Sequence, residues 1–107
     1  MFIERNVFYL KFGMGKPATD LWRAFLQTVP VQPDFRIRLL SDLSGAAYVL
    51  VLELAYGTYA ELEPSRCRLT KLPGWRAFYE QFIPMCERSE RTLYREIEGI
   101  TPATPRH

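Results

Sequence analysis

The sequence predicts one α+β domain with elements in the order β-α-β-β-α-β, the second helical segment being interrupted. Its 107 residues are close to the commonest length of a single domain. Apolar residues alternate in four segments, as in half-buried strands, and recur at helical spacing in the segments between them. Proline and glycine separate these segments. We therefore expect a four-stranded antiparallel sheet with helices packed against it.

Composition and charge favour an ordinary globular protein. Hydrophobic residues make up 48% of the chain and charged residues 24%. A formal charge of +2 is too small an excess to indicate a nucleic-acid-binding surface. Charges interrupt the first five residues, and the longest apolar run, Ala46 to Leu52, is only strand-length. We therefore expect no signal peptide, no membrane span and a cytoplasmic location.

The two cysteines predict neither a disulfide nor a metal site. Cys67 and Cys86 lack the CxxC spacing, and nothing near them in sequence would stabilise a thiolate. With the terminal His107 they would not complete the four ligands of a structural zinc site. We expect two inert free thiols, no metal and no cofactor.

The first two elements are a strand and a helix. Residues 2–12 alternate, with Phe2, Phe8, Leu10 and Phe12 predicted on one face. Pro17 suits the first turn of a helix, which we expect over residues 18–29. Pro30 and Pro33 would end it. Its predicted apolar stripe is Leu21, Ala24, Phe25 and Thr28, widened by Trp22, Leu26 and Val29.

Two strands joined as a hairpin follow. Phe35, Ile37 and Leu39 alternate with Arg36, Arg38 and Leu40. Residues 41–45 form a predicted turn, and residues 46–56 a third strand whose apolar character indicates a central place in the sheet. So short a link predicts antiparallel pairing.

The second half of the chain predicts helical segments and a last strand. Thr58 and Glu61 have the spacing of a capping box, and Pro64 would bend or break the helix that they start. A second apolar stripe at helical spacing follows, and Pro84 would end or bend the helix that carries it. We expect a polar connector over residues 87–90, a fourth strand over 91–100 and a flexible tail over 101–107, so that residues 1–100 form the domain. The stripe consists of Trp75, Phe78, Tyr79, Phe82 and Ile83.

This order places the helices on one face of the sheet, because crossovers are right-handed. The other face is then uncovered. Tyr9, Val49, Val51 and Tyr94 are expected to be spread over both faces, so that neither is wholly polar. A second copy of the chain is the simplest cover for such a face.

At three places the sequence resembles the dimeric α/β-barrel (ferredoxin-like) superfamily and, within it, the NIPSNAP-like family. Residues 9–16 are similar to the family's strand and Gly-Lys turn before a helix. Tyr56-Gly57-Thr58 into Glu61 resembles its passage from third strand to second helix. Residues 72–78, continuing to Phe82-Ile83-Pro84, resemble its late helix.

The resemblance implies a ferredoxin-like βαββαβ fold and a homodimer whose two sheets face each other inside a barrel. It also implies a pocket between sheet and helices in the superfamily's enzymes, several of which act on small, often aromatic molecules. Some members are cofactor-independent oxygenases, some are isomerases and some bind haem. The fold does not choose among these activities.

The sequence contains no catalytic constellation. Gly13-Met14-Gly15-Lys16 lacks the spacing of a phosphate-binding loop, and His107 is the only histidine. Polar strand residues such as Arg5, Asn6 and Glu53 would form cross-strand pairs or converge on a cavity. The aromatic residues would be ordinary core or pocket lining. The candidate pocket residues are Trp22, Arg36, Arg38, Tyr48, Trp75 and Tyr79.

Two hypotheses of function remain. The favoured one is a small-molecule-binding homodimer, extending to a cofactor-independent enzyme that acts on a hydrophobic or aromatic metabolite. The alternative is a non-catalytic protein-interaction module. A partly polar cavity under the helices favours the first hypothesis, and a fully packed interior favours the second.

Overall fold

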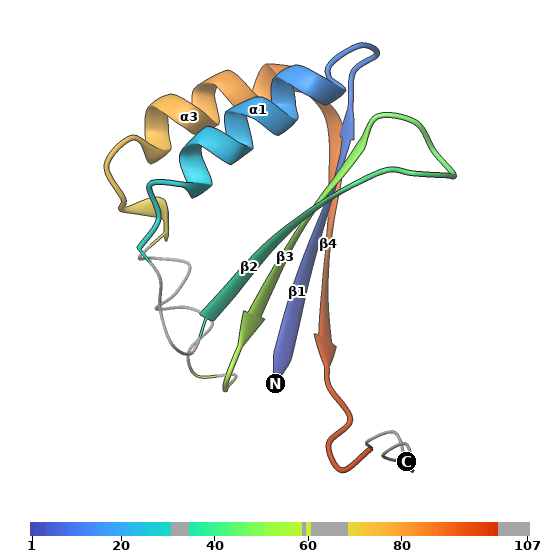
Figure 1. The fold of residues 1–107 in the computed structure, drawn as a ribbon, viewed down its shortest axis with the longest axis vertical. Helices are drawn as coiled ribbons and strands as arrows, with labels where there is room; N and C mark the ends of the chain where they lie inside the picture. Colours follow the sequence, from blue (N-terminus) through green and yellow to red (C-terminus); the bar gives the residue numbers. More distant parts are fainter. Residues whose placement is uncertain (31–34, 59, 61–68, 101–107) are drawn as a thin grey trace, which may run out of the picture.

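The computed structural model of the chain describes residues 1–30, 35–58, 60 and 69–100. A four-stranded sheet forms one layer and two helices form the other (Figure 1). The predicted α+β, ferredoxin-like order is confirmed. The elements are β1 (Phe2–Leu10), α1 (Gly15–Leu26), β2 (Phe35–Ser41), β3 (Val49–Tyr56), α3 (Trp75–Phe82), the 3-10 turn η2 (Ile83–Met85) and β4 (Cys86–Arg95).

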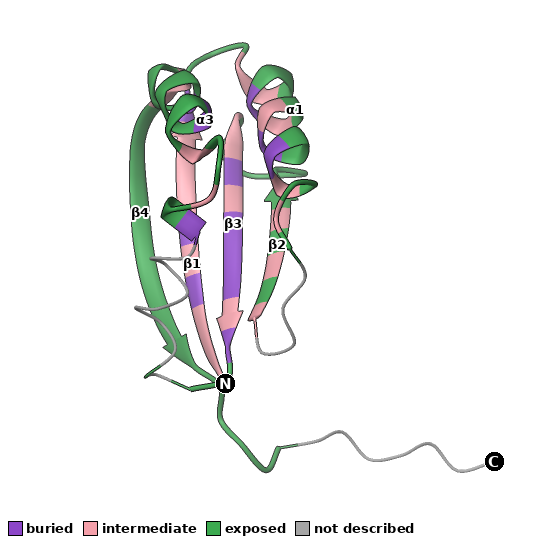
Figure 2. Ribbon diagram, turned by 90° about the vertical axis from the view of Figure 1, so that its left-hand side faces the viewer, coloured by how far each residue is buried: buried purple, intermediate pink, exposed green. Residues whose placement is uncertain are grey.

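The sheet is antiparallel throughout, with strand order β2-β3-β1-β4. The apolar strand β3 lies beside β1 at the centre, as its composition predicted, and β2 and β4 form the two edges. Both helices lie on the same side of the sheet (Figure 1). β4 is exposed along most of its length, whereas β3 is buried along its centre (Figure 2).

The register divides the strand side chains into two sets. Even-numbered residues of β1 and β3 face the helices, together with odd-numbered residues of β2 and, from Ser89 to Arg95, of β4. The opposite side has no helix over it in the described structure, and we call it the open face. It carries Ile3, Arg5, Val7, Tyr9, Arg36, Arg38, Leu40, Val49, Val51, Glu53, Ala55, Arg88, Glu90, Thr92 and Tyr94.

This division corrects one expectation. Tyr9, Val49, Val51 and Tyr94 do not occupy both faces, because the register brings all four to the open face. The open face is therefore the one that carries these four residues, mixed with arginine and glutamate.

The buried stripe of α1 is centred one position away from the one predicted. Ala18, Trp22 and Phe25 are buried, whereas Ala24 and Thr28 are exposed. The helix also begins earlier, at Gly15, so that Pro17 is its third residue. Proline is tolerated there because the first-turn amides have no partner within the helix.

β1 ends at Leu10, two residues before its predicted end. The Lys11 amide donates to the Met85 carbonyl, and the Met14 amide closes a turn on the Lys11 carbonyl. Gly13 adopts a positive φ of 80° in this turn, a conformation that glycine allows without strain. Phe12 therefore leaves the sheet and is 87% exposed.

β3 begins at Val49 rather than at residue 46. Tyr48 has a φ of 59°, which is incompatible with an extended strand, and Gly45 has a φ of 86°. The connection between β2 and β3 is therefore residues 42–48, longer than the turn predicted over 41–45.

β4 begins at Cys86 and ends at Arg95, so the predicted connector over residues 87–90 is part of the strand. These residues are polar because they lie on an exposed edge strand, and a polar strand is easily mistaken for a loop. In α3, only Phe78 and Phe82 of the predicted stripe are fully buried. Tyr79 and Ile83 are 42% and 51% exposed.

Several predictions concern residues outside the described part of the chain: Pro33, the capping-box partner Glu61, Pro64, Cys67 and the tail 101–107. Cys86 has a free thiol, and burial raises its pKa. None of the described helices combines the length and the apolar character needed to cross a membrane.

Candidate functional site

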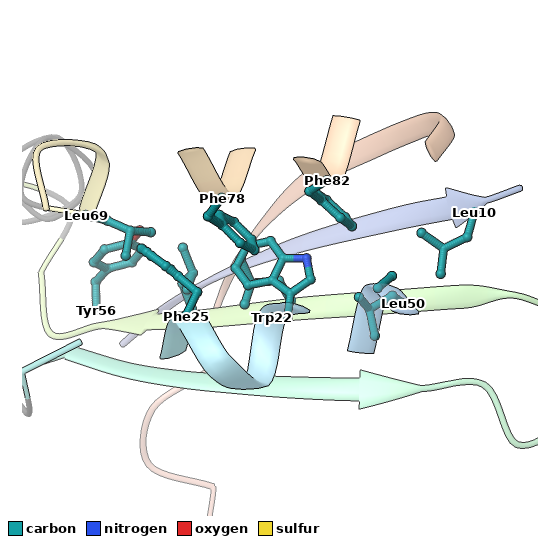
Figure 3. Packing of buried hydrophobic residues seen from close by; sticks show 11 residues of the cluster. Leu10, Trp22, Phe25, Leu50, Tyr56, Leu69, Phe78 and Phe82 are labelled. Atoms are coloured by element: carbon teal, nitrogen blue, oxygen red, sulfur yellow. The ribbon is translucent and has the colours of Figure 1, made fainter. Parts of the chain in front are cut away.

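The space between sheet and helices is filled around Trp22, which projects from α1 and is 1% exposed. Its indole meets Phe78 and Phe82 edge to face, with ring centroids 4.6 Å and 5.3 Å away, and lies 5.9 Å from Phe8 of β1. Figure 3 shows the rings of Trp22, Phe78 and Phe82 between α1, α3 and the sheet. Such arrangements stabilise a core beyond the area that they bury.

Two polar atoms in this layer are fully buried and have no hydrogen-bond partner among the described residues: Trp22 Nε1 and the Tyr56 hydroxyl. Tyr56 is 0% exposed, and its ring packs 5.2 Å from that of Phe35. Folded proteins rarely leave such atoms unpaired, because an unmade buried hydrogen bond costs about 1–3 kcal/mol. Burial raises the pKa of Tyr56 to about 12, so its hydroxyl remains a donor at neutral pH.

A row of polar side chains lies on the same side of the sheet. Asn6 of β1 is 7% exposed and sits opposite Arg91 of β4. Arg91 donates from Nε to Asn6 Oδ1 at 3.1 Å, and Asn6 donates from Nδ2 to Glu4 Oε2 at 3.0 Å. Glu4 is 2% exposed. The row is therefore a chain of hydrogen bonds from an exposed guanidinium to a buried carboxylate.

The charge of Arg91 also acts on Tyr56. It lowers the pKa of the phenol and so opposes the larger effect of burial. We call Glu4, Asn6, Arg91, Tyr56 and Trp22 the inner polar set.

The six residues predicted to line a pocket lie in three separate places. Trp22 is in the layer between sheet and helices, as expected. Trp75 and Tyr79 stack on each other along α3 with centroids 5.2 Å apart, and Trp75 also meets Phe25 at 5.5 Å. This pair lies on the exposed flank of the helix layer.

Arg36 and Arg38 project from β2 onto the open face, on the other side of the sheet from Trp22. Tyr48 lies in the connection before β3, where its ring meets that of Phe12 at 5.0 Å and approaches Gly15. The structure therefore does not bring the six residues into one site.

Arg38 belongs to a three-residue ion-pair network on the open face. Glu53 of β3 is 8% exposed and receives hydrogen bonds from Arg5 of β1, at 3.0 Å, and from Arg38 of β2. This is the cross-strand pairing that the sequence left as one of two alternatives. Burial alone would raise the pKa of Glu53, but the two arginines together hold it below its usual value.

We expect Glu53→Gln to reduce the free energy of unfolding by about 1–2 kcal/mol at pH 7, because both guanidiniums are partly solvated and so screened. The pKa of Glu53 is lower in the folded protein than in the unfolded chain, so its ionisation stabilises the fold above the ordinary value of 4.5. That stabilisation disappears as the pH falls through the lowered pKa. Urea unfolding at several pH values should show the gap between wild type and variant closing in acid.

Glu80→Gln provides the control, since Glu80 pairs with Arg76 on the exposed side of α3. Its effect should be close to zero at every pH. A gap for Glu53→Gln that persists unchanged below pH 3 would contradict the assigned role of the carboxylate.

Two open clefts border the helix layer on the β2 side. One, of about 400 Å³, lies between α1 and β2 and is lined in part by Thr19, Arg23 and Leu39. The other, of about 490 Å³, extends from Gly15 to Tyr48. Both reach Leu50, which Figure 3 shows beside Trp22 in the core. Among the described residues, no group of three or more His, Cys, Asp and Glu side chains is placed to hold a metal ion.

Four members of the inner polar set were not singled out as pocket residues from the sequence. Asn6 was noted only as a strand polar residue, and Arg91 only as the predicted start of the last strand. A signal for β1 existed, because Glu4 and Asn6 interrupt the face that carries Phe2, Phe8 and Leu10. Charged and amide side chains on an apolar strand face are rarely buried without partners.

Comparison with known proteins gives matches of structure rather than sequence. No protein-family model matches the sequence, and no curated protein matches it. The structure is similar to an uncharacterized NIPSNAP domain protein from Burkholderia xenovorans, with a TM-score of 0.77 at 20% identity over 95% of this chain and 100% of that one. A NIPSNAP family protein from Agrobacterium tumefaciens strain C58 gives 0.78 at 15% identity, over 92% of this chain and 88% of that one.

A third similar structure is that of an antibiotic biosynthesis monooxygenase, with a TM-score of 0.69 at 11% identity over 91% of this chain and 99% of that one. At these identities the likeness establishes the fold and not the activity. The resemblance seen in the sequence is thereby confirmed at the level of architecture: the chain has the ferredoxin-like α+β fold of the NIPSNAP and antibiotic biosynthesis monooxygenase structures.

Proposed function

We propose that this protein is a homodimer that binds a small, largely apolar molecule in the layer between its sheet and its helices. The observation that carries the proposal is that two buried donors in that layer, Trp22 Nε1 and the Tyr56 hydroxyl, have no hydrogen-bond partner among the described residues. An acceptor atom of a bound molecule would satisfy one of them. Because the layer is filled around Trp22, the molecule would enter from the open clefts on the β2 side, which reach Leu50.

The dimer half of the proposal concerns the open face. That face combines aliphatic and aromatic residues with charges of both signs, and no described helix covers it. A second copy presents the same mixture, which suits a two-fold interface. The kinship of fold with the dimeric α/β barrels supports the same arrangement. We keep the cytoplasm as the expected compartment, where the free thiol of Cys86 would stay reduced.

The proposal is tested on the two indole N–H signals of the uniformly ¹⁵N-labelled protein. Trp22 is buried and Trp75 half-buried, and the variant Trp75→Phe assigns the remaining signal to Trp22. We expect at least one of 2-naphthol, 2-naphthamide and 2-naphthoate to shift the Trp22 signal saturably and to leave that of Trp75 less affected. If none of them moves the Trp22 signal up to millimolar concentration, the proposal is wrong and a protein-interaction module becomes the better hypothesis.

Tyr56→Phe supplies a matched variant for this titration. It removes an unpaired buried hydroxyl and keeps the ring, so the free protein should be no less stable than wild type. Binding of the compound that shifts Trp22 should nevertheless weaken. A variant that loses stability and keeps full affinity would show that the hydroxyl serves the fold and not a ligand.

A further inference from the structure

The strand β2 forms one edge of the sheet, and half of its backbone amides face away from its neighbour β3. Its pairing with β3 is regular over Phe35–Ser41 and has no bulge. Just beyond the strand, the Asp42 amide donates to the Val49 carbonyl at 3.1 Å. Since amide directions alternate along a strand, the amides of Ile37 and Leu39 point outward from the sheet. A regular edge of this kind is a template for one further strand.

The cleft of about 400 Å³ between α1 and β2 lies directly beside this edge. Three consecutive residues of β2 line it, Leu39, Leu40 and Ser41, although neighbouring side chains of a strand point to opposite faces. The cleft therefore reaches the edge of the strand as well as its helix-facing side. Leu26 of α1 and Leu50 of β3 add apolar lining, and Figure 2 shows α1 and β2 along the same side of the molecule. An added strand would thus find an apolar place for a side chain on its helix-facing side.

The charge of β2 indicates what kind of strand would fit. The strand contains Arg36 and Arg38 and no acidic residue, and both arginines are exposed. Arg38 pairs with Glu53, whereas Arg36 has no hydrogen bond or ion pair among the described residues. The opposite edge, β4, instead mixes glutamates with arginines. A second copy of β2 would bring arginine against arginine, which is unfavourable, so a strand that carries carboxylates is the better occupant.

We infer that the edge of β2 binds an extended peptide segment of a partner protein, in which acidic and apolar residues alternate. The outward amides of Ile37 and Leu39 pair with the peptide backbone, and an apolar side chain of the peptide enters the cleft under α1. The acidic side chains lie beside Arg36 and Arg38. Backbone pairing supplies affinity in this mode of recognition, and the places for alternate side chains supply specificity. The inference goes beyond the proposed function and does not depend on it, because it requires no small molecule near Trp22.

The probe is the acetylated and amidated peptide Val-Glu-Val-Glu-Val-Glu-Val, titrated into the ¹⁵N-labelled full chain, and its control has lysine in place of glutamate. We expect the glutamate peptide to shift the amide signals of Ile37 and Leu39 saturably below about 1 mM and to slow their hydrogen exchange. The lysine peptide should bind at least about tenfold more weakly. In Arg36→Glu the preference for glutamate should fall by about fivefold. Arg95→Glu makes the same change of charge on β4 and should keep the wild-type preference.

Backbone pairing is tested with two further peptides, one N-methylated on its inner valines and the other on its glutamates. Only one of these alternate sets of amides faces β2, so one peptide should lose binding and the other should keep it. Equal binding of the two would overturn the inference, as would equal binding of the glutamate and lysine peptides. The absence of any saturable shift at Ile37 and Leu39 up to millimolar peptide would overturn it as well. In each case the titration of Trp22 with naphthyl compounds remains a separate test of the proposed function.

Discussion

Phe82→Ala is expected to lower the free energy of unfolding by about 3–5 kcal/mol, because it removes a large ring from a closely packed aromatic cluster. Phe82 is 1% exposed, and its ring meets Phe8 at 4.9 Å and Trp22 at 5.3 Å. The cavity left behind would adjoin three other rings that have few ways to collapse into it. Urea unfolding at one fixed protein concentration, followed by circular dichroism, measures the change.

The neighbouring residue provides the control. Ile83 is 51% exposed, so Ile83→Ala should lower the free energy of unfolding by no more than about 1 kcal/mol. The two residues are adjacent, Phe82 at the end of α3 and Ile83 at the start of η2, and they differ in burial. Equal losses for both would mean that the aromatic cluster does not dominate the stability of this layer.

This pair of residues also shows why the helices could be predicted but not their exact orientation. The spacing of Trp75, Phe78 and Phe82 identified α3 correctly, since apolar residues three and four apart share one face. Tyr79 and Ile83 fit the same pattern and yet lie largely exposed. An apolar stripe broader than the surface that it packs against leaves the rotation of the helix open, and only the partner settles it. The one-position difference in the stripe of α1 has the same cause.

The predicted strand boundaries were wrong where backbone conformation overrides composition. Ala46 and Ala47 continue the apolar run of β3, but the positive φ of Tyr48 excludes them from the strand. Conversely, Glu87 and Arg88 are polar but belong to β4. An edge strand exposed on both sides has little need of apolar residues, so its sequence does not differ from that of a connector.

The inner polar set was difficult to predict for a different reason. Its members come from β1, β3, β4 and α1, and they share one side of the sheet because of the strand order β2-β3-β1-β4 and of a register that pairs Asn6 with Arg91. These residues are 85 positions apart. No local pattern reports such a pairing. What the sequence does contain is the anomaly of Glu4 and Asn6 on an otherwise apolar strand face.

The two faces of the sheet answer different requirements. On the helix-facing side, Trp22 Nε1 and the Tyr56 hydroxyl have no hydrogen-bond partner among the described residues. On the open face, the buried carboxylate of Glu53 is fully engaged by two arginines. Polar groups that are paired within the chain suit a surface that another copy covers, because they need nothing from the partner. Unpaired donors suit a surface that receives a ligand.

Val51→Lys is expected to convert the proposed dimer into a monomer. Val51 lies on the central strand of the open face, between Leu40 of β2 and Val7 of β1. A two-fold interface would bury two copies of the new ammonium group near the existing arginines, and burying an unpaired charge costs several kcal/mol. The dimer should therefore weaken by at least about a hundredfold. Light scattering at micromolar concentration should give a dimer mass for wild type and a monomer mass for Val51→Lys. The control is Ala77→Lys, which places the same charge on the exposed surface of α3 and should remain a dimer. A wild-type monomer would refute the dimer, and an intact Val51→Lys dimer with native circular dichroism would show that the chains associate through another surface.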